Sequence, residues 1–212
     1  MEIQSFTFNP FQENTYIIYD ETKECVIIDP GCYSDAEKDQ LNKFITNEAL
    51  KPIKLINTHC HIDHILGNKF ASNEWGLELH IHKEDLPLLE NSVRISKMYN
   101  LENYEESPSA EKFLSEGDIV NFGNSSFEIL FTPGHSPGHI CLYNESEKLL
   151  IAGDVIFQKS IGRTDLPGGD YNTLIESIVT KIIPLPNETQ IFCGHGPSTI
   201  LEEEKRLNPF LQ

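Results

Sequence analysis

The sequence lacks any long apolar run. None of the hydrophobic stretches among its 212 residues approaches the roughly 20 residues that a membrane-spanning helix needs. Residues 1–4 also lack the basic and apolar regions of a secretory signal peptide. The hydrophobic content of 39% and the mixture of short apolar runs with polar helices are typical of a globular α/β protein. We therefore expect a cytoplasmic protein that does not bind membranes.

Basic residues are scarce. The chain has 16 lysines and arginines against 33 aspartates and glutamates, which gives a formal net charge of -17. Nucleic-acid backbones are bound by basic stripes, and none is visible here, so we expect no nucleic-acid partner. The overall field does not attract anions either. An anionic small-molecule substrate must therefore be held by local donors.

Cysteines are few and odd in number. The five lie mostly inside apolar runs: Cys25, Cys32, Cys60, Cys141 and Cys193. Buried thiols without disulfide bonds, in a reducing compartment, are the simplest interpretation. Cys60 lies between two histidines, but the alternation of side chains turns it away from them. We expect Cys60 to serve packing.

The chain also lacks a linker rich in Pro, Gly or Ser, so we expect one domain spanning residues 1–212. Apolar periodicity predicts strands at 3–8, 15–19, 25–28, 53–57, 78–82, 119–122, 127–131, 140–143, 149–152 and 190–193. Helices are predicted from a capping box at Ser34 and Glu37, and at 69–75, 171–183 and 199–207. Strands followed by a helix, twice, predict an α/β fold in which two ββα layers pack sheet against sheet: a four-layer αββα sandwich.

Residues 83–116 have a looser pattern, typical of an inserted helix and loop that join two halves. Two interpretations stay open for this segment. It is either a solvated connector or a lid that faces the substrate, since long loops in compact domains are often functional.

Three histidines and an aspartate occur in the run Thr58-His59-Cys60-His61-Ile62-Asp63-His64, just after an apolar strand. A strand that ends in a turn directs alternate side chains the same way, so His59 and His61 can reach one ion. The next bend lets Asp63 and His64 face a second ion. Imidazole nitrogen and carboxylate oxygen are ligands that zinc, iron and manganese accept. A single His-x-His pair occurs often by chance, but suitable ligands recur downstream.

Three further sites follow apolar strands, each beside a glycine that permits close backbone approach: His135, Asp154 and His195. Strand ends at one sheet edge converge in space, so ligands scattered along the sequence can meet. The complete set of candidate ligands is His59, His61, Asp63, His64, His135, Asp154 and His195. This number exceeds what one ion needs and suits two ions that share a carboxylate.

The other histidines are expected to be structural. His80 and His82 form a second His-x-His pair, but no Asp-His pair follows them. His139 begins a strand and is expected to make a structural hydrogen bond. Asp29, in the Asp29-Pro30-Gly31 turn, is either an ordinary turn residue or a second carboxylate that orients the metal loop.

The chemistry follows from the ligands. Two divalent ions held ~3.5–4 Å apart share a bridging water, lower its pKa towards neutrality and polarise a substrate carbonyl. No serine nucleophile is required, and the sequence has no G-x-S-x-G motif. A thiolate leaves with little proton help, and Asp63 is placed to orient the water or relay its proton. The expected cofactors are two divalent metal ions, zinc in the first place, with iron and manganese as alternatives.

The Thr-His-x-His-x-Asp-His run and the later Gly-His, Gly-Asp and Gly-His sites resemble the metallo-β-lactamase-fold hydrolases, most of all the glyoxalase II (hydroxyacylglutathione hydrolase) branch. The resemblance spans nearly the whole chain and includes residues 9–14 and 28–31. It implies one metal held by His59, His61, His135 and Asp154, and a second held by Asp63, His64, Asp154 and His195, with Asp154 bridging. It also implies hydrolysis of a thioester such as S-lactoylglutathione. An aspartate at 154, where antibiotic-degrading zinc lactamases carry cysteine, argues against a lactamase.

The chain departs from the longer glyoxalase II type, which has a C-terminal helical domain that holds glutathione. Little sequence follows His195, so we expect the short, single-domain type without that clamp. Arg163 matches a position where the longer type has a lysine that contacts the glutathione glycine. Arg163 either grips a substrate carboxylate through two hydrogen bonds, or forms a loop-stabilising salt bridge with Asp165 or Asp170.

Persulfide dioxygenases are the main alternative. They resemble this chain in the Gly-Arg-Thr-Asp segment and the histidine motif, but bind one iron through positions that match His59, His135 and Asp154. They tend to carry cysteine where this chain has His139, which favours a hydrolase. A non-enzymatic metal-binding protein would be indicated by a lost ligand, and all seven are present. The sequence thus predicts a metal-dependent thioester hydrolase that acts on a small molecule, and it carries no signal for an oligomeric state.

Overall fold

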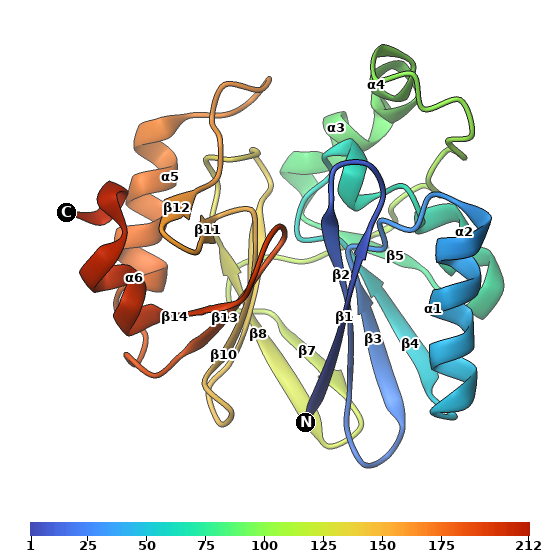
Figure 1. Ribbon diagram of the computed structural model, residues 1–212, viewed down its shortest axis with the longest axis horizontal. Coiled ribbons are helices and arrows are strands. Elements are labelled where there is room, and N and C mark those ends of the chain that lie inside the picture. Colours follow the sequence, from blue (N-terminus) through green and yellow to red (C-terminus); the bar gives the residue numbers. More distant parts are fainter. The chain divides into compact units, whose positions relative to one another are not determined.

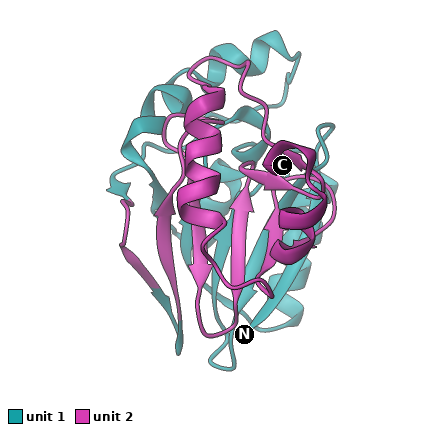
Figure 2. Ribbon diagram, turned by 90° about the vertical axis from the view of Figure 1, so that its left-hand side faces the viewer, with its two compact units in different colours: residues 1–113, 121–125 teal, residues 114–120, 126–212 magenta.

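The structure is a computed structural model that describes residues 1–212. Its contacts divide the chain into two compact units, coloured separately in Figure 2, and each unit is described by itself. Unit 1 consists of Met1–Phe113 and Asn121–Ser125, and unit 2 of Leu114–Val120 and Ser126–Gln212. That the chain forms a single domain stays a prediction.

Unit 1 is built on a six-stranded mixed sheet with the strand order β1-β2-β3-β4-β5-β6 (Figure 1). Its strands are β1 (Glu2–Phe8), β2 (Glu13–Tyr19), β3 (Glu24–Ile28), β4 (Lys51–Ile56), β5 (Leu79–Ile81) and β6 (Lys112–Phe113). Short turns make the first three strands antiparallel, whereas longer crossovers make β3 to β6 parallel. The register pairs Ile28 with Ile56, so the residues after β3 and β4 emerge at the same sheet edge.

The crossovers of unit 1 contain its helices. These are α1 (Asp35–Asn47), α2 (Asn68–Trp75), α3 (Leu86–Glu90) and α4 (Ser92–Met98), with 3-10 turns at Ile62–His64 and Lys83–Asp85. The predicted capping box is present: Ser34 and Glu37 exchange side-chain-to-backbone hydrogen bonds at the start of α1. Gly76, with a φ of 66°, ends α2 in the left-handed conformation that glycine adopts at no steric cost. Leu41 and Ala71 pack with the sheet in one core, and Figure 1 shows α1 and α2 along the same face.

Unit 2 is built on a second six-stranded mixed sheet, with the order β14-β13-β10-β9-β8-β7. Its strands are β7 (Ile119–Phe122), β8 (Ser125–Phe131), β9 (Ile140–Asn144), β10 (Leu149–Gly153), β13 (Gln190–Cys193) and β14 (Thr199–Ile200). β10 and β13 run parallel, and the pairs β8–β9, β9–β10 and β13–β14 run antiparallel. A small hairpin of β11 (Ile156–Phe157) and β12 (Ser160–Ile161) follows β10.

The helices of unit 2 are α5 (Tyr171–Ser177), which continues into a π-helical turn at Ile178–Ile182, and α6 (Leu201–Leu207), followed by a 3-10 turn at Pro209–Leu211. Asp170 caps α5, because its side chain accepts a hydrogen bond from Thr173 N at 2.8 Å. Leu174 and Leu201 pack against the sheet in the core of this unit.

The tip of the β7–β8 hairpin belongs to unit 1, where Asp20 holds it. The Asp20 carboxylate accepts hydrogen bonds from Thr22 N (2.9 Å), Asn124 N (2.6 Å) and the Ser125 hydroxyl (3.1 Å). Burial alone would raise the pKa of Asp20, but these hydrogen bonds outweigh it and lower that pKa. The side chain is therefore held in its charged form.

The elements that the sequence predicted are present, with ends shifted by a few residues. The two-residue strands β6, β11, β12 and β14 were missed, because two residues show no period, and the prediction of a helix from Thr199 was wrong in its first turn. The segment 83–116 contains α3, α4 and β6 rather than one helix and a loop. No helix has the length and apolar character needed to cross a bilayer.

Candidate metal centre

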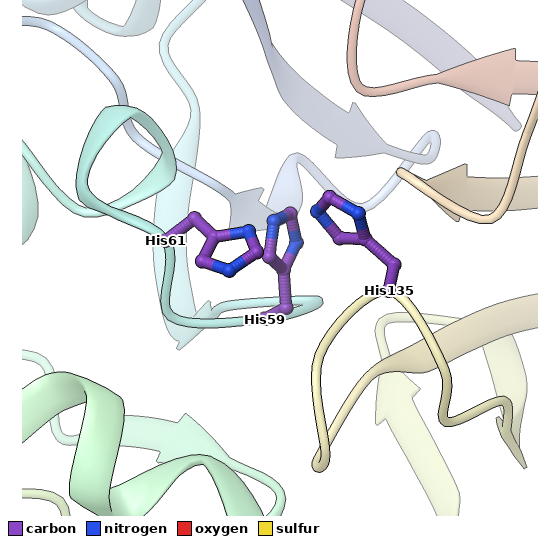
Figure 3. A group of neighbouring side chains, drawn as sticks. All are labelled: His59, His61 and His135. Carbon is purple, nitrogen blue, oxygen red and sulfur yellow. The ribbon is translucent and has the colours of Figure 1, made fainter. Parts of the chain in front are cut away.

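Four predicted ligands lie on one loop of unit 1, directly after β4. His59, His61, Asp63 and His64 occupy the connection to α2, and the last two lie in the 3-10 turn. The ring centroids of His59 and His61 are 4.8 Å apart, and those of His59 and His64 are 4.0 Å apart. Figure 3 draws His59 and His61 on this loop. The loop thus gathers three imidazoles and a carboxylate, as its sequence predicted.

Asp29, the first residue after β3, holds this loop. Its carboxylate, which is only 1% exposed, accepts hydrogen bonds from Thr58 N (2.7 Å) and the Thr58 hydroxyl (2.6 Å), and lies 3.1 Å from His64 Nδ1. Its φ of 48° lies in the left-handed region, which aspartate tolerates better than most residues. Asp29 is therefore both a turn residue and a second carboxylate that orients the loop, so both interpretations of the sequence apply.

These hydrogen bonds determine which nitrogen of two rings can bind a metal. A carboxylate only accepts, so His64 Nδ1 carries the proton that it donates to Asp29, and Nε2 keeps a lone pair. The Thr58 hydroxyl donates to Asp29 and therefore accepts from His59 Nδ1, 3.1 Å away. Nε2 of each ring is thus prepared to act as a ligand. Nε2 of His64 faces Oδ2 of Asp63 at 3.9 Å.

Two buried carboxyl groups beside this loop were missed by the sequence analysis. Asp85 accepts a hydrogen bond from Cys60 N, between the two loop histidines, at 2.7 Å. Glu13 is fully buried, accepts a hydrogen bond from Thr15 at 3.0 Å, and has a pKa that burial raises well above its usual range. A Cβ on Gly31 would lie 1.9 Å from a Glu13 oxygen, so this position requires glycine. Glu13 is the first residue of β2 and precedes the strand predicted at 15–19, so the apolar pattern carried no signal for its burial.

The other three predicted ligands come together in unit 2. His135 follows β8, Asp154 follows β10 and His195 follows β13. Oδ2 of Asp154 lies 3.5 Å from Nε2 of His135 and 3.5 Å from Nε2 of His195. One carboxylate oxygen therefore faces two imidazole nitrogens, which is the arrangement expected of a shared carboxylate. Figure 3 draws His135 on the loop after β8.

Neutral groups orient the ligands of unit 2. His135 Nδ1 donates to the Arg163 carbonyl at 2.7 Å, and because a carbonyl only accepts, Nε2 of that ring keeps a lone pair. His139 Nε2 accepts a hydrogen bond from Asp154 N at 3.0 Å, and its Nδ1 lies 3.1 Å from the Thr132 hydroxyl. Both nitrogens of His139 are therefore engaged. The predicted structural hydrogen bond is confirmed, and it fixes the backbone of Asp154.

The donor sets fit divalent metal ions. Two ligands about 2.1 Å from one tetrahedral ion lie about 3.4 Å apart, and Asp154 Oδ2 is 3.5 Å from His135 Nε2. A lone-pair nitrogen that faces a carboxylate oxygen is repelled unless a second proton or a cation lies between them. The same argument applies in unit 1 to His64 and Asp63. Imidazole and carboxylate donors of this kind suit zinc, iron and manganese alike.

The remaining histidines and Cys60 have structural roles, as predicted. His80 Nδ1 lies 3.0 Å from the Glu78 carbonyl, and His82 Nδ1 accepts a hydrogen bond from Glu84 N at 3.2 Å. None of the five cysteines forms a disulfide. Cys60 is buried in the core of unit 1, and burial raises the pKa of its thiol well above the usual range.

Arg163 forms the salt bridge that the sequence analysis offered as one of two interpretations. Its Nε and Nη2 each donate to an Asp165 carboxylate oxygen at 2.7 Å, and both side chains are more than half exposed. The hydrogen bonds from Arg163 lower the pKa of Asp165 to about 2. A substrate-binding role for Arg163 stays a prediction.

Comparison with known proteins assigns the chain to a family. The family described as the metallo-beta-lactamase superfamily matches residues 8–195. The chain belongs to the metallo-β-lactamase superfamily. It is 38% identical over 212 residues to the hydroxyacylglutathione hydrolase GloC of Haemophilus influenzae, covering 100% of this chain and 98% of that protein. It is 37% identical to the probable metallo-hydrolase YqgX of Bacillus subtilis, with 100% and 98% covered.

Solved structures agree. The BLEG-1 B3 metallo-beta-lactamase has a TM-score of 0.91 and 35% identity, with 100% of both chains covered. TTHA1623 in a di-iron-bound form has a TM-score of 0.88 and 35% identity, covering 98% of this chain and 100% of that one. ETHE1 from Myxococcus xanthus has a TM-score of 0.80 and 25% identity, covering 99% and 84%. The chain thus has the metallo-β-lactamase fold of mixed sheets and helices, and it is a metal-dependent hydrolase of this superfamily.

Proposed function

We propose that this metallo-β-lactamase superfamily member hydrolyses thioesters of glutathione or a related thiol, with S-lactoylglutathione as the representative substrate. The observation that carries the proposal is the Asp154 carboxylate, whose Oδ2 faces Nε2 of both His135 and His195. The similarity to GloC of Haemophilus influenzae supports the substrate class.

The proposed ligands are the candidate residues of both units. One ion would be held by His59, His61, His135 and Asp154, and a second by Asp63, His64, Asp154 and His195. Two divalent ions bound there would activate a water near neutral pH and polarise the substrate carbonyl. The similarity to TTHA1623, described as di-iron-bound, supports two ions. Zinc, iron and manganese are all compatible with these donors.

Asp63 is the proposed proton acceptor. Its side chain is 16% exposed and so accessible to water, and Oδ2 faces Nε2 of His64. Its carboxylate orients the attacking water and takes its proton. The leaving thiolate is stable at neutral pH, so no separate general acid is needed at the sulfur. This requirement favours thioesters over amides as substrates.

Arg163 is the proposed substrate-binding residue. The net charge of -17 does not draw anions to the protein, so a carboxylate on the thiol portion needs a local cation. A substrate carboxylate would replace Asp165 on the guanidinium fork. Both side chains of this ion pair are exposed, so water already competes for it and a substrate carboxylate can take the place of Asp165.

A persulfide dioxygenase is the second candidate. The Gly162-to-Asp165 segment, which resembles that of the persulfide dioxygenases, favours it. This enzyme would hold one iron through His59, His135 and Asp154. Against it stands His139, which holds the Asp154 backbone at a position where the dioxygenases tend to carry cysteine.

The test combines metal analysis with three assays on one preparation: S-lactoylglutathione hydrolysis, oxygen uptake with glutathione persulfide, and hydrolysis of a chromogenic cephalosporin. About two metal ions per chain with thioester hydrolysis alone would support the proposal. One iron with oxygen uptake would replace it with the dioxygenase. Cephalosporin hydrolysis without thioester hydrolysis would overturn it in favour of a lactamase, as the likeness to BLEG-1 requires us to check.

Asp154→Ala is the decisive variant. We expect bound metal to fall and kcat/KM to drop by about 10³-fold or more, which corresponds to about 4 kcal/mol of lost transition-state stabilisation. Glu188→Gln is the matched control in unit 2, because Glu188 is exposed and forms a surface ion pair with Lys148. Full activity in Asp154→Ala would rule out the shared-carboxylate site.

A further inference from the structure

The turn between β1 and β2 reaches the metal loop through the side chain of Asn9. Its Nδ2 donates to the carbonyls of both Gly31 and Asp63, each at 3.0 Å. Its Oδ1 accepts a hydrogen bond from Phe11 N at 3.0 Å. One amide side chain therefore joins three loops of unit 1: its own turn, the turn after β3, and the metal loop.

Asn9 is itself fixed before it reaches that loop. Its backbone N donates to Glu37 Oε1 at 2.7 Å, and the other Glu37 oxygen accepts from Tyr33 N and Ser34 N in the capping box of α1. Its φ of 52° is left-handed, a conformation that asparagine tolerates, and its carbonyl accepts from Gln12 N. The amide is thus presented to the loop by a preformed turn.

The space around this amide is shaped to admit it. A Cβ on Gly31 would lie 2.6 Å from Asn9 Nδ2 and 2.8 Å from the Asp63 carbonyl oxygen. Any other residue at position 31 would therefore push the amide away from its acceptors. The absence of a side chain at Gly31 therefore leaves room for both the Asn9 amide and the Glu13 carboxyl group.

We propose that Asn9 is a positioning residue that fixes the peptide plane between Asp63 and His64, and with it the direction of both side chains. The Asp63 carbonyl belongs to that plane, and a peptide is planar, so one hydrogen bond orients the backbone of two adjoining candidate ligands. Asp29 holds His64 through the imidazole ring, whereas Asn9 holds Asp63 and His64 through the main chain. The inference rests on the proposed function only in taking Asp63 and His64 as ligands of the second ion.

Two variants isolate the donor. Asn9→Asp keeps Oδ1 for Phe11 N and tolerates a left-handed φ, but it places a carboxylate oxygen against two carbonyls. Asn9→Gly keeps the backbone conformation and removes the side chain. Asn100→Asp is the matched control, because Asn100 is exposed, lies in unit 1 and has a φ of 56°. Urea unfolding of each variant checks that it is folded.

The measurement is a stepwise zinc titration of the metal-free protein against a chromogenic chelator. In both Asn9 variants we expect the affinity for the second zinc ion to be about 10–100-fold lower than in wild type. The affinity for the first zinc ion should stay within a few-fold of wild type. Asn100→Asp should titrate like wild type. In an Asp63→Ala background, Asn9→Asp should cause a smaller further loss, because only His64 remains of the two ligands that Asn9 orients.

Wild-type zinc affinity in both folded Asn9 variants would overturn the inference, and so would an equal loss in the Asp63→Ala background. The titration uses no thioester, so its outcome is independent of the substrate. A protein that shows the expected pattern but does not hydrolyse S-lactoylglutathione would refute the proposed function and leave the role of Asn9 established.

Discussion

The candidate ligands of unit 1 and those of unit 2 are held by different kinds of groups. In unit 1 they are nearly contiguous, and side chains from other loops fix them: the carboxylates of Asp29 and Asp85 and the amide of Asn9. In unit 2 they follow three separate strands, and neutral groups fix them: the Arg163 carbonyl and the His139 ring.

The difference follows from local structure. A 3-10 turn offers its residues few regular backbone hydrogen bonds, so the loop after β4 needs long-range side-chain contacts to keep one shape. Asp154 directly follows β10 and His195 lies two residues after β13, so the register of these paired strands sets their place, and they need only their ring or backbone orientation set. The half-site of unit 1 should therefore depend more on individual side chains than that of unit 2.

The largest effect is expected at Asp29. Asp29→Ala leaves the buried Thr58 amide without its acceptor and places alanine at a left-handed φ, so the free energy of unfolding should fall by about 2–4 kcal/mol. Zinc affinity should fall by about 10–100-fold, because His64 loses the group that sets its tautomer. Urea unfolding and chelator competition measure the two effects.

Asp29→Asn is the matched variant, because asparagine keeps the shape, one acceptor and the tolerance of a left-handed φ. It should retain most of the stability, but lose zinc affinity, since an amide NH2 cannot accept from His64 Nδ1. Unchanged zinc affinity in both variants would contradict the role assigned to Asp29.

A smaller effect is expected at His139 in unit 2. His139→Ala removes the acceptor of Asp154 N, so the free energy of unfolding should fall by about 1–3 kcal/mol and zinc affinity by roughly tenfold. His139→Gln, which can supply an acceptor again, should recover part of both. A loss of zinc affinity larger than that of Asp29→Ala would break the comparison between the units.

Acid should act on unit 1 through its carboxylates. Burial would raise the pKa of Glu37, but hydrogen bonds from Ser34, Tyr33 and Asn9 amides outweigh it and lower that pKa; the pKa of Asp20 is lowered in the same way. A folded-state pKa below the unfolded value contributes stability above the unfolded pKa, and this contribution is lost as pH falls through the folded value. The urea concentration at the midpoint of unfolding should therefore decrease as the pH is lowered below about 4.

Trp75, the only tryptophan, reports this transition from within unit 1. Asp20→Asn should lower the midpoint at pH 7 and flatten its dependence on pH, whereas the exposed control Glu90→Gln should leave the slope as in wild type. If the urea midpoint of Asp20→Asn depended on pH as in wild type, Asp20 would not contribute to the acid sensitivity.

The smallest effect is expected at Cys60. Cys60→Ala should leave the metal content unchanged and lower the free energy of unfolding by about 1 kcal/mol, because the thiol packs in the core rather than facing an ion. Metal analysis and urea unfolding check both. Loss of a metal ion would show that the side chain is a ligand after all.

The sequence was informative where chemistry and local pattern coincide. The run from His59 to His64 stands out because ligand types crowd a short segment, and His135, Asp154 and His195 stand out because each follows an apolar strand beside a glycine. The structural role of His139 was also predictable. These features depend on neighbours within a few residues.

The groups that hold the ligands were harder to predict, because their contacts depend on sheet register. Asn9 meets the Asp63 carbonyl across 54 positions, and Asp85 meets Cys60 across 25. An asparagine in a Pro-containing turn and an aspartate before a helix have ordinary local explanations. The pairing of β1 through β4 brings Asn9 to the metal loop, and the pairing of β4 with β5 brings Asp85 there.

The short β11–β12 hairpin has a consequence for insertions and deletions. It separates Asp154 from Arg163, whose carbonyl accepts the Nδ1 proton of His135, and a Cβ on Gly162 would lie 1.9 Å from the Asp154 carbonyl oxygen. One residue added or removed there would carry that carbonyl away from the ring and allow the proton to move to Nε2. We therefore expect the length of this hairpin, as well as its sequence, to set whether His135 presents a lone pair or a proton to a metal ion.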